Sequence, residues 1–223
     1  MVSCRCGLSP LCLGPYESGV NRYELPYAAP GQVVGLFGGS FDPAHEGHVH
    51  VTRTALRAFG LDQVWWMVTP GNPLKEDGPA PLEARVARAR ELMQHPKVEI
   101  TTIEEKFGTR FTAATLGRLL PLFPRVTFMW VMGADNLAHF HKWQEWREIA
   151  AMVPIGVVAR PGHGIGGRMS VAARYFREAR VHPAAGRLLH RANLPAWCFI
   201  NAPMRDESST ALRESGAWPK GRN

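Results

Sequence analysis

The segment 35–48, GLFGGSFDPAHEGH, places four glycines, a proline and two histidines within fourteen positions. Glycine has no Cβ, so the backbone there can bend sharply and come close to a ligand. His45 and His48 are three residues apart, and their rings share one side of the chain if a helix begins here. Imidazoles at the positive end of a helix suit an anion that gains charge during a reaction. The residue types therefore suit chemistry on phosphate.

The His-x-x-His spacing alone has two other interpretations. The pair could be half of a metal site, although such a site would want a third protein ligand. The rings could also be surface histidines that serve only the fold. On the motif alone the metal, phosphate and structural interpretations carry equal weight, so the surrounding elements must decide between them.

Short apolar runs alternate with longer helical stretches along the chain. The patterns predict strands over 32–37, 63–69, 98–101, 126–132, 155–159 and 196–200. They predict helices over 47–59, 82–94, 112–120, 143–150 and 169–194. Continuous apolar strands separated by helices indicate an α/β fold with a Rossmann-like parallel sheet and helices on both faces.

Parallel sheets of this kind bind ligands at the carboxyl ends of their strands. Three loops should therefore share one rim, over 38–48, 69–75 and 133–136. The glycine-rich stretch 160–167, RPGHGIGG, has neither a P-loop lysine-hydroxyl pair nor a Rossmann spacing, so we expect a loop without a phosphate site.

The length of 223 residues, 45% of them hydrophobic, predicts one domain. We expect an N-terminal extension with little order over 1–30, one main domain over 31–217 and a tail over 218–223. The longest apolar runs, 126–132 and 149–159, are shorter than the roughly 18 residues of a membrane span. Residues 1–30 lack the continuous apolar stretch of roughly 7–15 residues that a signal peptide needs. The expected location is the cytoplasm, with no membrane partner.

The formal net charge is +7, from 26 basic and 19 acidic residues. The arginines are dispersed, and no nucleic-acid signature is present, so the charge indicates an anionic small substrate and no nucleic-acid partner. Cys4, Cys6 and Cys12 lie near the N-terminus, and Cys198 lies far from them. The cluster has no fourth zinc ligand nearby, which favours incidental thiols.

The pattern G-G-S-F-D-P-x-H-x-G-H after a first strand resembles the signature of the nucleotidyltransferase superfamily that carries the H-x-G-H motif. This superfamily includes nicotinate-mononucleotide, nicotinamide-mononucleotide and pantetheine-phosphate adenylyltransferases and several cytidylyltransferases. The resemblance implies that His45 and His48 are catalytic and stabilise the triphosphate of ATP as the bond to pyrophosphate breaks. It also implies ATP contacts at Gly38, Gly39, Ser40 and Phe41.

The segment 208–213, SSTALR, resembles a second motif of the superfamily, S-S-T-x-[IL]-R. The resemblance implies that Ser208, Ser209 and Thr210 bind ATP at the start of a helix and that Arg213 acts on its phosphates. The residue types agree, because hydroxyl side chains cap helices and the guanidinium fork suits phosphate. Glu207 departs from the family, which usually has an apolar residue before this motif.

The segment 132–146, MGADNLAHFHKWQEW, is similar to bacterial nicotinate-mononucleotide adenylyltransferases. The similarity implies nucleotide contacts at Gly133 and Asp135, and a stacking role for Trp143 on the pyridine ring. The alternative for Trp143 and Trp146 is that both face the core, which we assign more readily to Trp146. Lys75, in GNPLK, resembles the family's basic residue near the ATP phosphates.

The segment 111–116, FTAATL, resembles the family's Y-T-x-D-T-L. The resemblance implies that the backbone amides of Phe111 and Thr112 contact the carboxylate of nicotinate at a helix start. Phe111 replaces the tyrosine and Ala114 replaces the aspartate, which preserves backbone contacts but removes any role of that carboxylate.

The implied activity joins ATP and nicotinate mononucleotide into nicotinate adenine dinucleotide and pyrophosphate, a step of NAD biosynthesis. Mg²⁺ would enter on the ATP oxygens, with no metal ligand assigned to a protein side chain. The alternatives within the class use nicotinamide mononucleotide or pantetheine phosphate as the acceptor. The alternative outside it is a non-catalytic nucleotide- or RNA-binding protein, which the two intact motifs disfavour.

Overall fold

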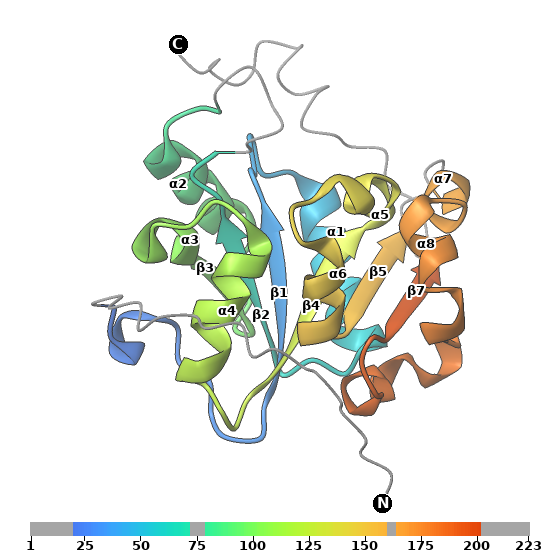
Figure 1. The fold of residues 1–223 in the computed structure, drawn as a ribbon. Helices are drawn as coiled ribbons and strands as arrows, with labels where there is room; N and C mark the ends of the chain where they lie inside the picture. Colours follow the sequence, from blue (N-terminus) through green and yellow to red (C-terminus); the bar gives the residue numbers. More distant parts are fainter. Residues whose placement is uncertain (1–19, 72–78, 160–163, 202–223) are drawn as a thin grey trace, which may run out of the picture.

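A computed structural model describes residues 20–71, 79–159 and 164–201. Within them, seven strands form one sheet in the order β3-β2-β1-β4-β5-β7-β6, with every neighbouring pair parallel (Figure 1). The strands are β1 (Val33–Gly39), β2 (Gln63–Val68), β3 (Val98–Thr101), β4 (Thr127–Gly133), β5 (Ile155–Ala159), β6 (Arg180–Val181) and β7 (Trp197–Asn201). The predicted Rossmann-like parallel fold is confirmed.

The central strands are buried along almost their whole length. In β5 every residue is buried, and in β1 the first five residues are. Valine, isoleucine and aromatic residues dominate these strands and fit a pleated surface that is covered on both sides. Apolar runs without alternation were therefore the correct signal for a sheet between two layers.

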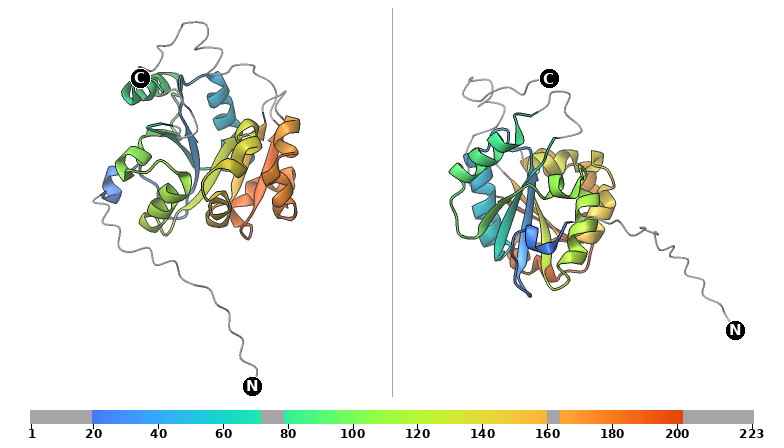
Figure 2. Two further views of the ribbon diagram at one scale, coloured as in Figure 1. Left: turned by 45° about the horizontal axis from the view of Figure 1, so that its top comes forward. Right: turned by 90° about the vertical axis from the view of Figure 1, so that its left-hand side faces the viewer.

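Helices cover both faces of the sheet, as Figure 2 shows. One face packs against α1 (Glu46–Ala58), α2 (Leu82–Leu92) and the 3₁₀ helix η4 (Pro183–Arg191). The other packs against α3 (Ile103–Phe107), α4 (Thr112–Leu122), α5 (Ala134–His139), η2 (Phe140–Lys142), α6 (Trp146–Met152) and α8 (Val171–Tyr175). The fold therefore has two hydrophobic cores, one on each side of the sheet.

The chain reverses its direction across the sheet between β1 and β4. From β1 it moves outward to β2 and β3, and it then returns to place β4 on the other side of β1. In open α/β sheets, ligands bind at such a switch point, beyond the carboxyl ends of the two strands. The loops after β1 and β4 flank this position.

Three predicted elements differ from the structure. The predicted helix over 169–194 is divided into α8, η3 (Arg177–Ala179), β6 and η4, because Pro183 lacks an amide donor and Arg180 and Val181 pair with β7. The predicted helix over 143–150 begins only at Trp146, because Glu145 has a left-handed backbone, and α5 and η2 precede it. Short elements such as these have too few residues to show a period.

The predicted loop over 160–167 is wrong for its second half, because Gly164–Arg168 forms α7; residues 160–163 lie outside the described part. A Cβ on Gly167 would lie 2.9 Å from the carbonyl oxygen of Ala134, so glycine here allows α7 to pack closely on α5.

Residues 20–30 pack against the domain before β1 begins. Leu25 and Ala28 are buried in the same hydrophobic cluster as Trp65, and the ammonium of Lys106 donates a hydrogen bond to the carbonyl of Glu24 in η1 (Arg22–Glu24). Part of the segment predicted as an extension therefore contributes to the core.

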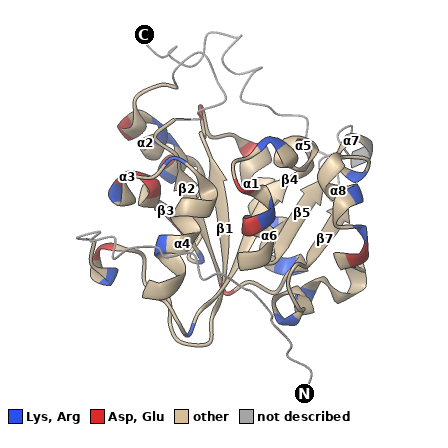
Figure 3. Cartoon of the chain, viewed as in Figure 1, with Lys and Arg blue, Asp and Glu red and all other residues tan. Residues whose placement is uncertain are grey.

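Charged side chains lie on helices of both layers, and Lys and Arg are spread over several of them (Figure 3). None of the helices in the described part is long and apolar enough to cross a bilayer.

Candidate active site

The two histidines of the first motif lie together where β1 leads into α1. His45 is the N-cap of α1, and its Nδ1 accepts a hydrogen bond from the Gly47 amide at 3.1 Å. His48 lies in the first turn, and its Nδ1 accepts from the His45 amide at 3.2 Å. The ring centroids are 3.9 Å apart. The predicted juxtaposition of the two imidazoles is therefore observed.

These two hydrogen bonds define which nitrogen of each ring carries a proton. A backbone amide can only donate, so Nδ1 of both rings must be an acceptor without hydrogen. The neutral imidazole then carries its proton on Nε2. The start of α1 thus holds two Nε2–H donors side by side at the positive end of the helix.

Aromatic rings support the loop between β1 and α1. Phe41 has a left-handed backbone, with φ of 46°, which costs a non-glycine residue roughly 1–2 kcal/mol. Its ring stacks on Trp66 of β2 at 4.7 Å, and the Trp66 indole donates to Thr52 at 2.7 Å. Thr52 in turn donates to the carbonyl of His48 at 2.9 Å. Packing and hydrogen bonds together keep the strained loop in place.

The ring of Trp130 lies between Gly38, at the end of β1, and the ring of Trp143. Trp130 of β4 is fully buried beneath Gly38, and its ring meets that of Trp143 edge to face at 6.0 Å. Trp143 is half-buried and follows η2 in an extended conformation, so it does not lie on a helix. Trp146 packs against Phe140 and Tyr175.

We expect Gly38→Ala to destabilise the protein. A Cβ at this position would lie 2.7 Å from Cη2 of the buried Trp130 ring, and overpacking of this kind costs about 1–3 kcal/mol. Gly117→Ala is the matched control, because α4 leaves open space there and the same change gains about 0.5–1 kcal/mol of helix propensity. Urea denaturation should shift the two midpoints in opposite directions; equal midpoints for Gly38→Ala and the parent chain would contradict the packing argument.

The predicted nucleotide contacts of the fourth strand lie at the switch point. Gly133 ends β4 and precedes α5, and the carboxylate of Asp135 folds back over it so closely that a side chain on Gly133 would collide with it. Phe111 and Thr112 begin α4, where the first amides of a helix point outward from its end. Phe111 is 40% exposed.

Arg85 of α2 organises the rim although no sequence motif points to it. It is 1% exposed, and its guanidinium donates to carbonyls that follow β1 and β2 and to one that precedes α2. Burial lowers the pKa of Arg85, and the carboxylate of Asp42 opposes that shift. Asp42 also accepts from the Ala80 amide at 3.3 Å.

Glu104 of α3 is a buried carboxyl group beside the end of β2. Burial raises its pKa from the ordinary 4.5 to about 7, and a hydrogen bond with Thr69 opposes the shift. The hydroxyl of Thr69 also lies within hydrogen-bond distance of the Gly71 carbonyl oxygen, at 2.8 Å. No described residue gives Oε2 of Glu104 a hydrogen-bond partner.

Comparison with known proteins identifies the family to which the sequence belongs. The sequence pattern of the cytidylyltransferase-like family matches residues 36–215. The chain belongs to that family.

Some relatives within the cytidylyltransferase-like family share more than half of their residues with this chain over most of its length. A "Probable nicotinate-nucleotide adenylyltransferase" of Roseobacter denitrificans is 60% identical over 197 residues, which cover 88% of this chain and 99% of the relative. A protein of the same description from Ruegeria pomeroyi is 59% identical, over 88% of this chain and 92% of the relative. A nicotinic acid mononucleotide adenylyltransferase of Plasmodium falciparum, solved with NaAD, has a TM-score of 0.61 at 16% identity, covering 82% of this chain and 83% of that one. The last similarity is one of fold.

Several predicted site residues of this cytidylyltransferase-like chain lie outside the described residues, namely Lys75, Ser208, Ser209, Thr210 and Arg213. The others lie at the ends of β1 and β4, at the starts of α1, α4 and α5, and at the end of η2. Arg85, Glu104 and Trp130 are additions from the structure, and only their position between predicted site segments could have drawn attention to them.

Proposed function

We propose that this chain is a nicotinate-nucleotide adenylyltransferase, which joins ATP and nicotinate mononucleotide into nicotinate adenine dinucleotide and releases pyrophosphate. The observation that carries the reaction type is the pair of imidazoles at the start of α1, both with Nδ1 occupied by an amide donor. The acceptor is assigned from relatives that match this chain over nearly their whole length. Both substrates are anions, in agreement with the chain's net charge of +7.

In the proposed reaction the phosphate of the mononucleotide attacks the α-phosphorus of ATP, and the bond from that phosphorus to the bridging oxygen breaks. The attacking oxygen is already an anion, so no protein base is required. The protein's part is positioning and charge stabilisation. Nε2–H of His45 and His48 would donate to phosphate oxygens that gain charge, while Gly38 and Gly39 let the backbone approach them. Ser40 and Phe41 complete this loop.

Residues outside the described part complete the proposed triphosphate site. We assign Lys75 and Arg213 to the phosphates as cations, and Ser208, Ser209 and Thr210 to hydrogen bonds with them. Gly133 and Asp135 would contact the nucleotide at the switch point.

We propose that Mg²⁺ accompanies ATP. The described residues contain no group of three or more His, Cys, Asp or Glu that could cage a metal ion. Mg²⁺ in nucleotide sites is commonly held by phosphate oxygens and water. When bound, Mg²⁺ would neutralise part of the triphosphate charge.

The mononucleotide is assigned to the region of Trp143 and the start of α4. The amides of Phe111 and Thr112 would receive the nicotinate carboxylate, and the indole of Trp143 would stack on the electron-poor pyridine ring. The edge-to-face contact with Trp130 supports this assignment, because it fixes the plane of the Trp143 ring.

We expect Trp143→Ala to raise KM for nicotinate mononucleotide about three- to tenfold, the equivalent of one lost aromatic stack, with KM for ATP unchanged. Trp143→Phe should retain most of the affinity. Trp146→Phe is the control, because the ring of Trp146 packs against those of Phe140 and Phe176, and phenylalanine keeps an aromatic ring there. A rise in KM for ATP instead would contradict the assignment of Trp143 to the mononucleotide.

The proposed function is tested by pyrophosphate release from purified protein with ATP and Mg²⁺. Comparison of kcat/KM for nicotinate mononucleotide, nicotinamide mononucleotide and phosphopantetheine identifies the acceptor. A preference for nicotinate mononucleotide supports both the reaction and the carboxylate site. Equal use of the two pyridine nucleotides would retain the enzyme and reject the carboxylate site, and turnover with none would reject the function.

A further inference from the structure

Arg85 connects three backbone segments at the rim of the sheet. Its Nη1 donates to the carbonyls of Ser40 and Thr69, each at 2.7 Å. Its Nη2 donates to the carbonyl of Pro70 at 3.1 Å, and its Nε donates to that of Ala80 at 2.7 Å. One buried guanidinium thus takes up four carbonyl groups, which a planar fork with five N–H donors can do and a lysine ammonium with three donors cannot.

The carbonyls belong to the loops that flank the proposed triphosphate site. Ser40 directly follows β1, and Thr69 directly follows β2, the neighbouring strand. Asp42 adds a second connection, since its carboxylate accepts from the Ala80 amide. The β1 loop is therefore attached to the start of α2 by both a cation and an anion.

The hydrogen bonds to Arg85 also determine where backbone amides point. In a trans peptide the C=O and N–H groups point in opposite directions. When Arg85 holds the Ser40 carbonyl, the amide of Phe41 must face away from the guanidinium, and the same holds for Pro70 and the amide of Gly71. Phe41 has a left-handed backbone that this peptide orientation helps to maintain.

We infer that Arg85 is a positioning residue for the triphosphate of the nucleotide: it draws the carbonyls of the β1 and β2 loops inward and so directs their amides, and with them the His45 and His48 pair, toward the phosphates. The inference rests on the proposed function for the identity of the ligand. Arg85 itself is 1% exposed and makes no contact with substrate in this account.

Arg85→Lys tests this role, because it keeps the charge and removes the fork. We expect kcat to fall at least about tenfold and KM for ATP to rise about fivefold or more, as for a displaced catalytic group. KM for nicotinate mononucleotide should stay within about twofold, because its proposed site at α4 and Trp143 is not attached to Arg85. A role in folding alone would reduce the amount of active enzyme and leave both KM values unchanged.

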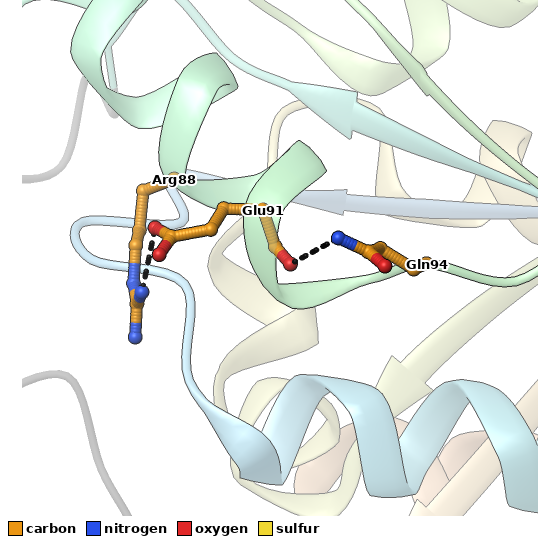
Figure 4. Close-up of polar contacts among 3 residues, drawn as sticks. All are labelled: Arg88, Glu91 and Gln94. Atoms are coloured by element: carbon orange, nitrogen blue, oxygen red, sulfur yellow. Dashed lines mark hydrogen bonds and ion pairs between the residues drawn. The ribbon is translucent and has the colours of Figure 1, made fainter.

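Arg88→Lys is the matched control on the same helix. Figure 4 shows the ion pair between Arg88 and Glu91. Arg88 lies one turn from Arg85, its guanidinium is 2.8 Å from the Glu91 carboxylate, and the two side chains are 38% and 69% exposed. Exposed ion pairs of this kind contribute little to the free energy of unfolding. All three kinetic constants of Arg88→Lys should match the parent enzyme within about twofold.

The outcomes separate the inference from the proposed function. Calorimetric binding of a non-hydrolysable ATP analogue to the parent chain and to Arg85→Lys measures the positioning effect even if the parent chain shows no turnover. Weaker binding of the analogue by Arg85→Lys supports the inference. Equal binding and equal kinetics would overturn it, and so would failure of both Arg85→Lys and Arg85→Gln to fold, which would assign Arg85 to the fold alone.

Discussion

His48→Ala is expected to lower kcat at least tenfold, within a range that reaches about 10²–10³-fold for the loss of one charge-stabilising donor. Nδ1 of His48 accepts a hydrogen bond from the amide of His45, so the ring proton lies on Nε2, which in the proposed reaction would donate to the phosphates. Because this donor acts mainly as the pyrophosphate bond breaks, KM should change much less than kcat. Steady-state kinetics with ATP and nicotinate mononucleotide measure the effect.

Two further variants isolate the catalytic part of this loss. His48→Asn retains an acceptor for the His45 amide but removes Nε2, so it should be as inactive as His48→Ala if Nε2 is the catalytic atom. His50→Ala removes an imidazole on the same helix two positions away, which faces another direction. Full activity of His48→Asn would show that His48 only caps the helix, and loss of activity in His50→Ala would show that the effect is not specific.

Glu104→Gln is expected to stabilise the protein at alkaline pH. Burial raises the pKa of Glu104 from 4.5 to about 7, so the folded protein binds this proton more tightly than the unfolded chain. The free energy of unfolding of the parent protein should therefore fall as pH rises from about 4.5 through about 7. The loss is about 2–4 kcal/mol once the carboxylate is fully ionised, at 1.36 kcal/mol for each unit of pKa.

Glutamine is neutral at every pH, so the variant should lack this dependence. Urea denaturation at pH 5 and pH 8.5 measures it: the two proteins should be about equally stable at pH 5, and the variant should be more stable at pH 8.5. Glu105→Gln is the control, because Glu105 is the next residue of α3 and is exposed. Parallel stability curves for Glu104→Gln and the parent protein would contradict a protonated Glu104 in the folded state.

The parallel sheet could be predicted because its strands are continuous apolar runs. The boundaries predicted for 98–101 and 155–159 agree with β3 and β5. The elements that the patterns missed are short, such as α3, α5 and β6, and they form because neighbouring elements provide the missing partners. A two-residue strand such as β6 has no periodicity of its own and exists through its pairing with β7.

The first motif was informative because its proposed function requires particular residue types at fixed spacing. Glycines, a helix start and two imidazoles are all visible in sequence. Arg85 is different, since its partners are backbone carbonyls, which every residue has and no sequence records. Glu104 is different for a related reason: whether a carboxyl group keeps its proton depends on burial, and burial follows from the tertiary fold.

The packing of residues 20–30 shows that the folded domain begins earlier in the chain than the family pattern does. The family pattern begins at residue 36, whereas Leu25 and Ala28 are already buried in the hydrophobic cluster that includes side chains of α3 and α4. A chain shortened to start at Gln32 would keep the loops after β1 and β4 and would lose the side chains of Leu25 and Ala28 from this core. The segment that packs as one domain is therefore longer than the segment that the family pattern matches. An engineered fusion or truncation should keep the residues from about Leu25 onward.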